Sequence, residues 1–270
     1  MIIGPRPGES LLLSGAGECV RVVASAGVAV VAGSGGGLAP VHLTAAKGRI
    51  TVDGLINWFS YVGDNTDKIV EATLQHARIA LVVIAAATVF AVAVGIAVQR
   101  RPTARNAVLT VAAIFLTIPS LALFALFIPL VGIGNPPAII ALFMYSLLPI
   151  LRNTVTGLDE VDPAVVESAR GMGLTQRQQL LRIKLPLAWP LIMTGVRVSS
   201  LLVVGIAAIA VLVGGDGLGT FLQSGLTRLG FPGSVESVWV GVVFTVLLGL
   251  LLDVGFSLVQ RLTTSRGLRI

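Results

Sequence analysis

Five long apolar runs constrain the fold of this chain more than any other feature. Crossing the hydrocarbon core of a bilayer takes about 20 helical residues, and each run reaches that length or comes close to it. Hydrophobic residues make up 55% of the chain and charged residues only 12%, a balance unlike that of a soluble domain. We therefore expect an all-α integral membrane protein with about five transmembrane helices. The runs are residues 79–98, 107–131, 137–151 (expected to continue into 152–157), 191–213 and 235–258.

The basic residues between the runs predict an orientation in the membrane. The 99–106 loop, the 152–190 loop and the C-terminal tail together hold eleven Lys and Arg residues, whereas the 132–136 and 214–234 loops hold one, Arg228. Loops rich in Lys and Arg stay in the cytoplasm. We therefore expect a multi-pass protein of the plasma (cytoplasmic) membrane, with its N-terminus outside and with its C-terminus and the 152–190 loop in the cytoplasm. This topology accounts for the net charge of +6 without a nucleic-acid partner.

Residues 1–51 do not share this pattern. They are rich in Gly, Ala and Val without a clean period, and their apolar part, residues 22–38, is too short and too interrupted by glycine to cross a bilayer. It also lies too far from the N-terminus to form a good signal peptide. We expect a poorly defined N-terminal extension, disordered or loosely attached, with a poorly formed extra span as the alternative. Residues 52–76 mix aromatic and acidic side chains, as interfacial segments do, so residues 52–270 are expected to form the transmembrane domain.

Local signals in the 152–190 loop predict a helix, a sharp turn and a second helix. Asp162 can cap a helix that starts at the proline after it, and Gly173 supplies the permissive backbone that ends this helix. Thr175 and Gln178 fit a capping box at the start of the second helix, and Pro186 is expected to stop it. A polar hairpin between membrane spans suits a docking element. An ordinary solvated loop is the alternative.

Residues 167–186 of this loop, ESARGMGLTQRQQLLRIKLP, resemble the EAA loop of ABC importer permeases, E-A-A-x3-G-x9-I-x-L-P, with Ser168 in place of the central alanine. The resemblance implies a type I importer (MetI-like) bundle, in which this loop binds a separate ATPase. It also implies a coupling role for Glu167, for which a surface ion pair with Arg170 is the alternative. The predicted coupling residues are Glu167, Ser168, Ala169, Gly173, Ile183, Leu185 and Pro186.

Residues 117–197 resemble, more specifically, permeases of the glycine betaine, carnitine and choline (osmoprotectant) branch of these importers. The matching segments are IPSLAL (118–123), PAIIAL (137–142), YSLLPILRNT (145–154) and VDPA (161–164). Beyond this stretch, the glycine-rich GGDGLG (214–219) also resembles a turn of this branch. The resemblance implies transport of a quaternary amine into the cell. It implies as partners an ATPase dimer that binds ATP and Mg, a solute-binding protein, and a second permease copy or a sister permease. The chain itself is expected to bind no cofactor and not to be an enzyme.

Other functions remain open at this point. Importers of amino acids and other small polar solutes share the EAA loop, so such a cargo is an alternative. A secondary carrier is less favoured, because no inverted repeat with intramembrane charges is visible. A membrane enzyme is disfavoured because H-E-x-x-H and G-x-S-x-G are absent, because His42 and His76 are expected outside the bundle or near its edge, and because Asp253 stands alone in the last span. Cys19 is the only cysteine, so we expect no cysteine-based metal site.

Three aromatic residues are candidates for lining a translocation path: Phe124, Phe127 and Tyr145. Aromatic faces attract quaternary ammonium groups, although contact with the core or with lipid is the alternative. In this family such recognition normally belongs to the binding protein. Arg197 lies about two turns into the fourth span. We interpret it as a structural anchor whose side chain reaches toward the cytoplasmic surface, with a gate as the alternative.

Overall fold

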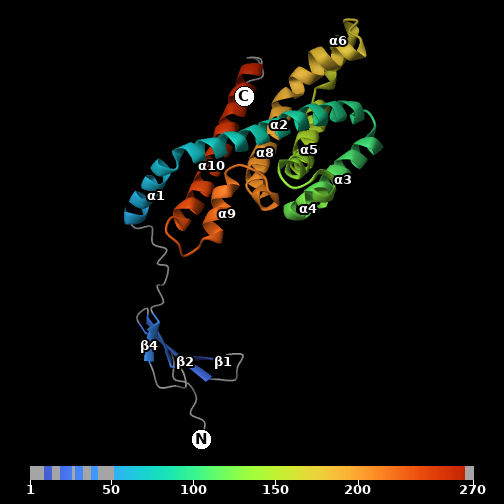
Figure 1. Cartoon of the computed structure of the whole chain (residues 1–270). Coiled ribbons are helices and arrows are strands. Elements are labelled where there is room, and N and C mark those ends of the chain that lie inside the picture. The colour runs from blue at the N-terminus through green and yellow to red at the C-terminus, as the bar shows by residue number, and fades with distance from the viewer. Residues whose placement is uncertain (1–8, 14–18, 26–27, 33–37, 42–51, 265–270) are drawn as a thin grey trace. The chain divides into compact units, whose positions relative to one another are not determined.

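The computed structural model describes residues 9–13, 19–25, 28–32, 38–41 and 52–264 of the chain. It divides into two compact units, Met1–Leu55 and Ile56–Ile270 (Figure 1). The division at residues 51 and 52 that the sequence suggested remains a prediction.

The described part of the N-terminal unit is a four-stranded antiparallel sheet. Its strands follow one another in the order β1-β2-β3-β4, with Leu11 opposite Arg21 and Val23 opposite Val30. We expected no regular structure in this region, because its apolar residues do not alternate with polar ones. Valine-rich runs separated by glycine nevertheless favour strands. The strands are β1 (Glu9–Leu13), β2 (Cys19–Ser25), β3 (Val28–Ala32) and β4 (Leu38–Val41).

The second unit is all-α, as expected. Four of its helical segments are long and apolar enough to cross a membrane, and a bent pair, α3 and α4, makes a fifth. The prediction of about five spans is therefore confirmed. The helices are α1 (Val52–Asp64), α2 (Thr66–Val98), α3 (Pro102–Thr117), α4 (Ser120–Val131), α5 (Asn135–Asp159), α6 (Pro163–Gly171), α7 (Gln176–Gln179), the π-helix η1 (Leu180–Lys184), α8 (Leu185–Ala207), the 3-10 helix η2 (Ala210–Val213), α9 (Gly219–Thr227) and α10 (Ser234–Thr263).

The second span, expected over residues 107–131, is broken into two helices. Helices α3 and α4 meet at 99°. The break lies at Ile118 and Pro119, whose ψ angles of 131° and 137° are extended. A proline disfavours helical backbone at the residue before it and removes a helical donor. The Tyr145 hydroxyl donates a hydrogen bond to the carbonyl of Ile118, so a carbonyl at the break has a partner within the membrane.

Helix α5 packs closely against α8 and α2 at the centre of the bundle (Figure 1). The α5–α8 crossing depends on glycine: a Cβ at Gly195 would lie 2.8 Å from the Pro149 carbonyl oxygen, and a Cβ at Gly157 would lie 3.0 Å from that of Ala188. Small residues let membrane helices approach until their backbones touch. A hydrogen bond from Ser199 Oγ to the Ser146 carbonyl oxygen, 2.9 Å long, also joins the two helices.

Candidate functional site

The predicted hairpin in the 152–190 loop is present, and its first helix begins as expected. The side chain of Asp162 accepts a hydrogen bond from the Ala164 N–H at 2.8 Å, and Pro163 occupies the first turn of α6. This cap satisfies a donor that the helix itself cannot satisfy.

The turn after α6 depends on Gly173, which has a φ of +81°. The N–H of Leu174 donates to the Ala169 carbonyl at 3.1 Å, and the N–H of Gly173 donates to the Arg170 carbonyl at 2.9 Å. This pair of bonds is a Schellman motif, which ends a helix at a left-handed residue. A Cβ at Gly173 would meet no atom within 4 Å, so the backbone conformation, and not crowding, calls for glycine here.

The second helix begins with the predicted capping box. The backbone N–H of Gln178 donates to Thr175 Oγ1 at 3.4 Å, and the backbone N–H of Thr175 donates to Gln178 Oε1 at 2.8 Å. The side-chain amide of Gln179 then donates to the Leu174 carbonyl at 2.8 Å, and Gln179 itself is buried. Both ends of the turn are therefore fixed by local hydrogen bonds.

The expectation that Pro186 stops this helix is wrong. Helix α7 continues through the π-helix η1 into α8, so that Gln176–Ala207 forms one candidate membrane span. The N–H of Leu185 donates to the carbonyl of Leu180, five residues earlier. A π-turn leaves carbonyls without their usual partners, and it can therefore accommodate Pro186, which has no N–H to donate.

The hairpin projects from one end of the bundle, the end at which α10 finishes (Figure 1). Its surface combines exposed charges with exposed apolar side chains, including Met172 at 71% and Leu181 at 51% exposure. Glu167 is also exposed. The alternative ion pair between Glu167 and Arg170 is not formed, and no other described residue pairs with this carboxylate. The hairpin thus presents an unpaired carboxylate and apolar groups, as a protein-binding surface does.

The predicted coupling residues do not all lie on this surface. Glu167, Ser168, Gly173 and Pro186 are exposed, whereas Ala169 is 1% exposed. Ser168 donates to the Ala164 carbonyl within α6 at 2.8 Å. Ile183 and Leu185 are half-buried, and Leu185 packs against a buried cluster formed by Leu158, Ala188 and Ile192. The motif therefore divides into exposed residues that face outward and buried or half-buried residues, of which Leu185 packs against the spans.

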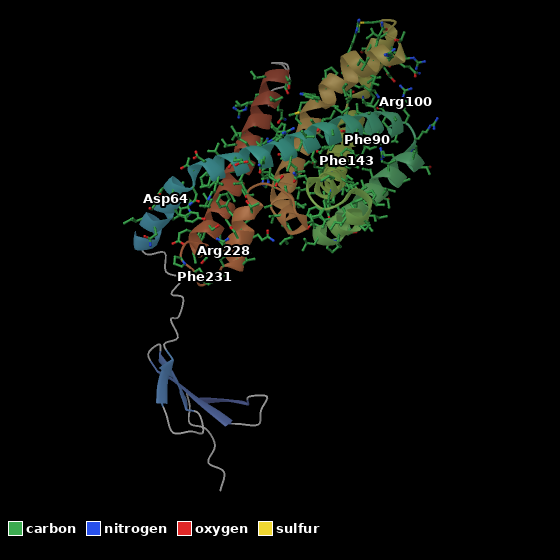
Figure 2. The ribbon with its side chains drawn as sticks, in the orientation of Figure 1. Asp64, Phe90, Arg100, Phe143, Arg228 and Phe231 are labelled. Atoms are coloured by element: carbon green, nitrogen blue, oxygen red, sulfur yellow. The ribbon has the colours of Figure 1, made fainter. Side chains whose placement is uncertain are left out.

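Two contacts that sequence reasoning missed join the 99–106 loop to the hairpin and to the end of α5. Arg100, at the turn between α2 and α3 (Figure 2), donates to Gln176 Oε1 at 2.6 Å. Arg105 forms an ion pair with Asp159 at the end of α5. The sequence showed these arginines only as members of a basic loop. Their partners lie 76 and 54 residues away, so no local signal identifies them.

The three candidate path residues lie together around the break in the second span. Phe124 is 0% exposed and Tyr145 is 2% exposed, in one apolar cluster against which Phe127 is partly buried. In this conformation of a single chain they pack against protein, and they do not face an open channel. Their role in a path remains a prediction.

Arg197 and Asp253 form an ion pair between α8 and α10. Arg197 Nε lies 2.8 Å from Asp253 Oδ1, and Nη2 lies 2.9 Å from Oδ2. Asp253, which the sequence showed without a second carboxylate nearby, therefore has a partner of opposite charge on another span. Arg197 was expected to reach toward the cytoplasmic surface, and its side chain contacts this acid; its role as an anchor remains a prediction. Charged residues within membrane spans usually pair in this way.

The expectation that His76 lies outside the bundle or near its edge is also wrong. It is 1% exposed on α2, and its Nε2 lies 3.1 Å from the Val204 carbonyl oxygen near the end of α8. Gly217, with a φ of +119°, lies over this histidine: a Cβ at Gly217 would lie 3.1 Å from His76 Nδ1. The glycine-rich 214–219 segment is thus a turn packed on α2. His42 lies outside the described residues.

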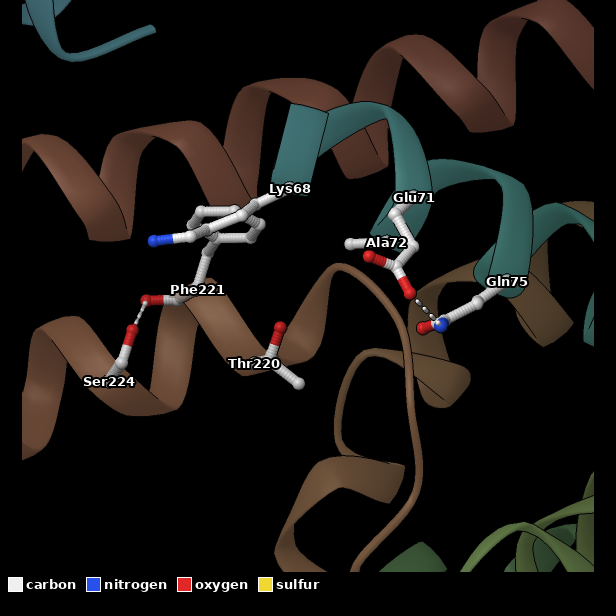
Figure 3. Close-up of a pocket in the computed structure, with 7 residues that line it drawn as sticks. All are labelled: Lys68, Glu71, Ala72, Gln75, Thr220, Phe221 and Ser224. Atoms are coloured by element: carbon white, nitrogen blue, oxygen red, sulfur yellow. Dashed lines mark hydrogen bonds between the residues drawn. The ribbon is translucent and has the colours of Figure 1, made fainter. Parts of the chain in front are cut away.

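A polar pocket of about 340 Å³ lies between α2 and α9 (Figure 3), and Figure 1 places α9 at the other end of the bundle from α6. Lys68, Glu71 and Gln75 line it from α2, and Thr220 and Ser224 line it from α9. The side-chain amide of Gln75 donates a hydrogen bond to Glu71 Oε1 at 3.2 Å. Across the described part of the chain, no group of three His, Cys, Asp or Glu residues is placed to hold a metal ion.

Comparison with known proteins supports the resemblance seen in the sequence. Residues 69–265 match the family model described as binding-protein-dependent transport system inner membrane component. The chain is 37% identical over 210 residues to the glycine betaine/carnitine/choline transport system permease protein OpuCB of Bacillus subtilis, covering 78% of this chain and 95% of the relative. It is 36% identical over 214 residues to the osmoprotectant import permease protein OsmW of Salmonella typhimurium, covering 77% and 98%.

The solved structure of an inward-facing MetNI methionine ABC transporter has the same fold. It aligns with a TM-score of 0.64 at 24% sequence identity, covering 73% of this chain and 96% of the chain compared. The expected type I importer (MetI-like) bundle is confirmed.

Proposed function

Because this chain belongs to the family of binding-protein-dependent transport system inner membrane components, we propose that it is the permease subunit of an ABC importer that moves a quaternary amine such as glycine betaine, choline or carnitine into the cell. The observation that carries the proposal is the hairpin of α6 and α7. It holds the EAA-type residues, projects from the bundle and exposes the unpaired Glu167 carboxylate. The cargo class rests on the names of relatives that align with most of this chain.

The proposed partner at the hairpin is a pair of ATPase subunits, which hold ATP and Mg. The outward-facing groups of the hairpin supply the contact, whereas Ala169 is buried and Leu185 packs against the spans. Movement of the ATPase subunits on ATP binding would then reach the spans through this element. The chain itself has no G-x-x-x-x-G-K-[ST] loop, and we propose that it hydrolyses no ATP alone.

The proposed orientation puts the hairpin in the cytoplasm and the N-terminus outside. Three observations support it: the basic loops carry most of the Lys and Arg residues, Arg100 and Arg105 contact the hairpin and the end of α5, and α10 ends on the same side as α6 (Figure 1). A solute-binding protein would meet the opposite end, where the 214–219 turn and α9 lie. A second permease copy or a sister permease would complete the path.

Purification and uptake test this proposal directly. The tagged chain, isolated from its own membranes, should bring an ATPase subunit with it. In proteoliposomes that contain ATP inside and the binding protein outside, labelled glycine betaine, choline or carnitine should accumulate in preference to labelled methionine. Recovery of the permease without any ATPase would refute the importer assignment. Preferential accumulation of an amino acid would refute only the cargo.

A further inference from the structure

Helices α2, α3 and α5 enclose a cavity of about 520 Å³ that only apolar residues line. Phe90 and Phe143 close one part of it, with their ring centroids 5.6 Å apart at an interplanar angle of 61° (Figure 2). Phe90 and Val111, which both line the cavity, are 50% and 51% exposed. The cavity is therefore a groove that opens on the outer surface of the chain, between α2 and α3.

The groove follows α2 from Phe90 to Val94, in the direction of the α2–α3 turn that carries Arg101. Arg101 follows Phe90 by eleven positions along α2 and the turn after it, which corresponds to a rise of about 16 Å at 1.5 Å per residue. Half of the hydrocarbon core of a bilayer is about 15 Å thick. The stretch of chain from Phe90 to Arg101 is therefore about as long as one leaflet is thick.

The turn at this end carries positive charge that the protein does not fully compensate. Arg105 pairs with Asp159, and Arg100 donates to Gln176. Arg101 is exposed, and none of the residues that the structure describes forms an ion pair or a side-chain hydrogen bond with it. Residues 99–106 contain no acid. An exposed guanidinium without a partner among the described residues therefore lies in the turn that joins two of the helices lining the groove.

We propose that this groove holds an acyl chain of an anionic phospholipid whose phosphate binds Arg101. Water does not suit the groove, because a buried water needs polar partners and the lining offers none. A hydrocarbon chain fills apolar space without a desolvation cost, and a phosphate is the group that guanidinium binds best at a lipid surface. The lipid would fill the space between α2 and α3, which otherwise contact each other little, and would support the broken second span from outside.

Lipid retention in native mass spectrometry tests the acyl-chain part. The intact permease complex is reconstituted in equal amounts of phosphatidylglycerol and phosphatidylcholine, extracted in mild detergent and weighed with its bound lipids. Ala112 is buried and lines the groove, whereas its neighbour Ala113 does not line it. Ala112→Phe should lower lipid retention about tenfold or more, equivalent to about 1.4 kcal/mol, and Ala113→Phe should leave it unchanged. Val111→Trp is a second variant that fills the groove from an exposed position.

The headgroup part has its own test in the same measurement. Wild-type protein should retain phosphatidylglycerol in preference to phosphatidylcholine, and Arg101→Gln should abolish this preference. Arg228→Gln, at an exposed arginine in the loop between α9 and α10, is the matched control and should keep it.

Three results would overturn the proposal. Equal lipid retention in wild-type, Ala112→Phe and Val111→Trp proteins would show that no lipid occupies the groove. Equal retention of the two lipids by wild-type protein would refute the role of Arg101. If wild-type protein retains no lipid and Val111→Trp loses the permease dimer, the groove is an interface between two copies of the chain. None of these measurements depends on which solute the chain carries.

Discussion

Arg197 on α8 and Asp253 on α10 lie within the transmembrane bundle with both nitrogens of one guanidinium edge against both oxygens of one carboxylate, at 2.8 and 2.9 Å. The side chains are 35% and 25% exposed in the single chain. This pair joins α10, the last span, to α8, the helix that continues from the hairpin. Arg197 precedes Asp253 by 56 residues in the sequence.

Removal of one partner of this pair should destabilise the protein. Arg197→Ala leaves the Asp253 carboxylate within the membrane without its partner, and Asp253→Ala leaves the Arg197 guanidinium there without its partner. Breaking a buried pair costs about 3–5 kcal/mol, and partial exposure reduces this to about 1–3 kcal/mol. Thermal unfolding of the purified protein should show the loss. The double variant should lose less than the two single losses combined, and strict additivity would show that the pair contributes nothing.

The Gly173→Val substitution should distort the hairpin without affecting the spans. A valine at a φ of +81° is strained by about 1–3 kcal/mol, although no neighbouring atom would obstruct it. We expect normal membrane insertion, weaker binding of the ATPase and a strong fall in uptake. The matched control is Gly171→Val, since Gly171 also has open space around its Cβ but lies in α6 without a positive φ. Equal ATPase recovery with both variants would argue against a role for the turn in docking.

The Glu167→Lys substitution should weaken docking through charge alone. The carboxylate is exposed and unpaired in the described structure, so its reversal should leave the fold intact. A loss of about 1.4 kcal/mol at the contact with the ATPase is a tenfold fall in affinity, measurable by titration of the ATPase onto the immobilised permease. Glu160→Lys, an exposed acid at the end of α5, is the control. If both variants bind as wild type does, Glu167 is not part of the contact.

The Tyr145→Phe substitution should loosen the break in the second span. It removes one hydrogen bond, to the carbonyl of Ile118, at a net cost of about 0.5–1.5 kcal/mol. The effect should appear as a lower unfolding temperature and as faster hydrogen exchange around Pro119. Tyr61→Phe provides the comparison, because no hydrogen bond of its hydroxyl is seen among the described residues. Equal stability of the two variants would show that the hydroxyl does not support the break.

Local structure in the hairpin was predictable from the sequence because each signal acts on its nearest neighbours. The Asp162 cap, the Gly173 turn and the Thr175 capping box all depend on residues within five positions. Prolines were less predictable. Pro119 breaks the second span with a bend of 99°, and Pro186 lies in a helix that it was expected to stop. The difference comes from the surroundings: Tyr145 supports the first break, and a π-turn accommodates the second proline.

The contacts between spans were not predictable, because they depend on which helix faces meet. His76 reaches a carbonyl 128 residues away, and Arg197 reaches an acid 56 residues away. In the sequence both appeared as isolated polar residues. A buried histidine on a membrane helix does indicate that some partner exists, but it does not say which one. The same limit applies to Arg100 and Arg105, whose partners belong to the hairpin and to the end of α5.

The unbroken run from α7 through the π-helix to α8 has a mechanical consequence. On the α5 side, three residues that belong to neither helix, Glu160, Val161 and Asp162, connect α5 to the first helix of the hairpin. On the α8 side, the hairpin and the span form one continuous helical segment. This segment is about 48 Å long if its 32 residues rise by 1.5 Å each. Movement of the hairpin would therefore be transmitted along α8 to its far end, which lies against His76, and the π-helix and Pro190 are places along this segment where regular α-helical hydrogen bonding is interrupted.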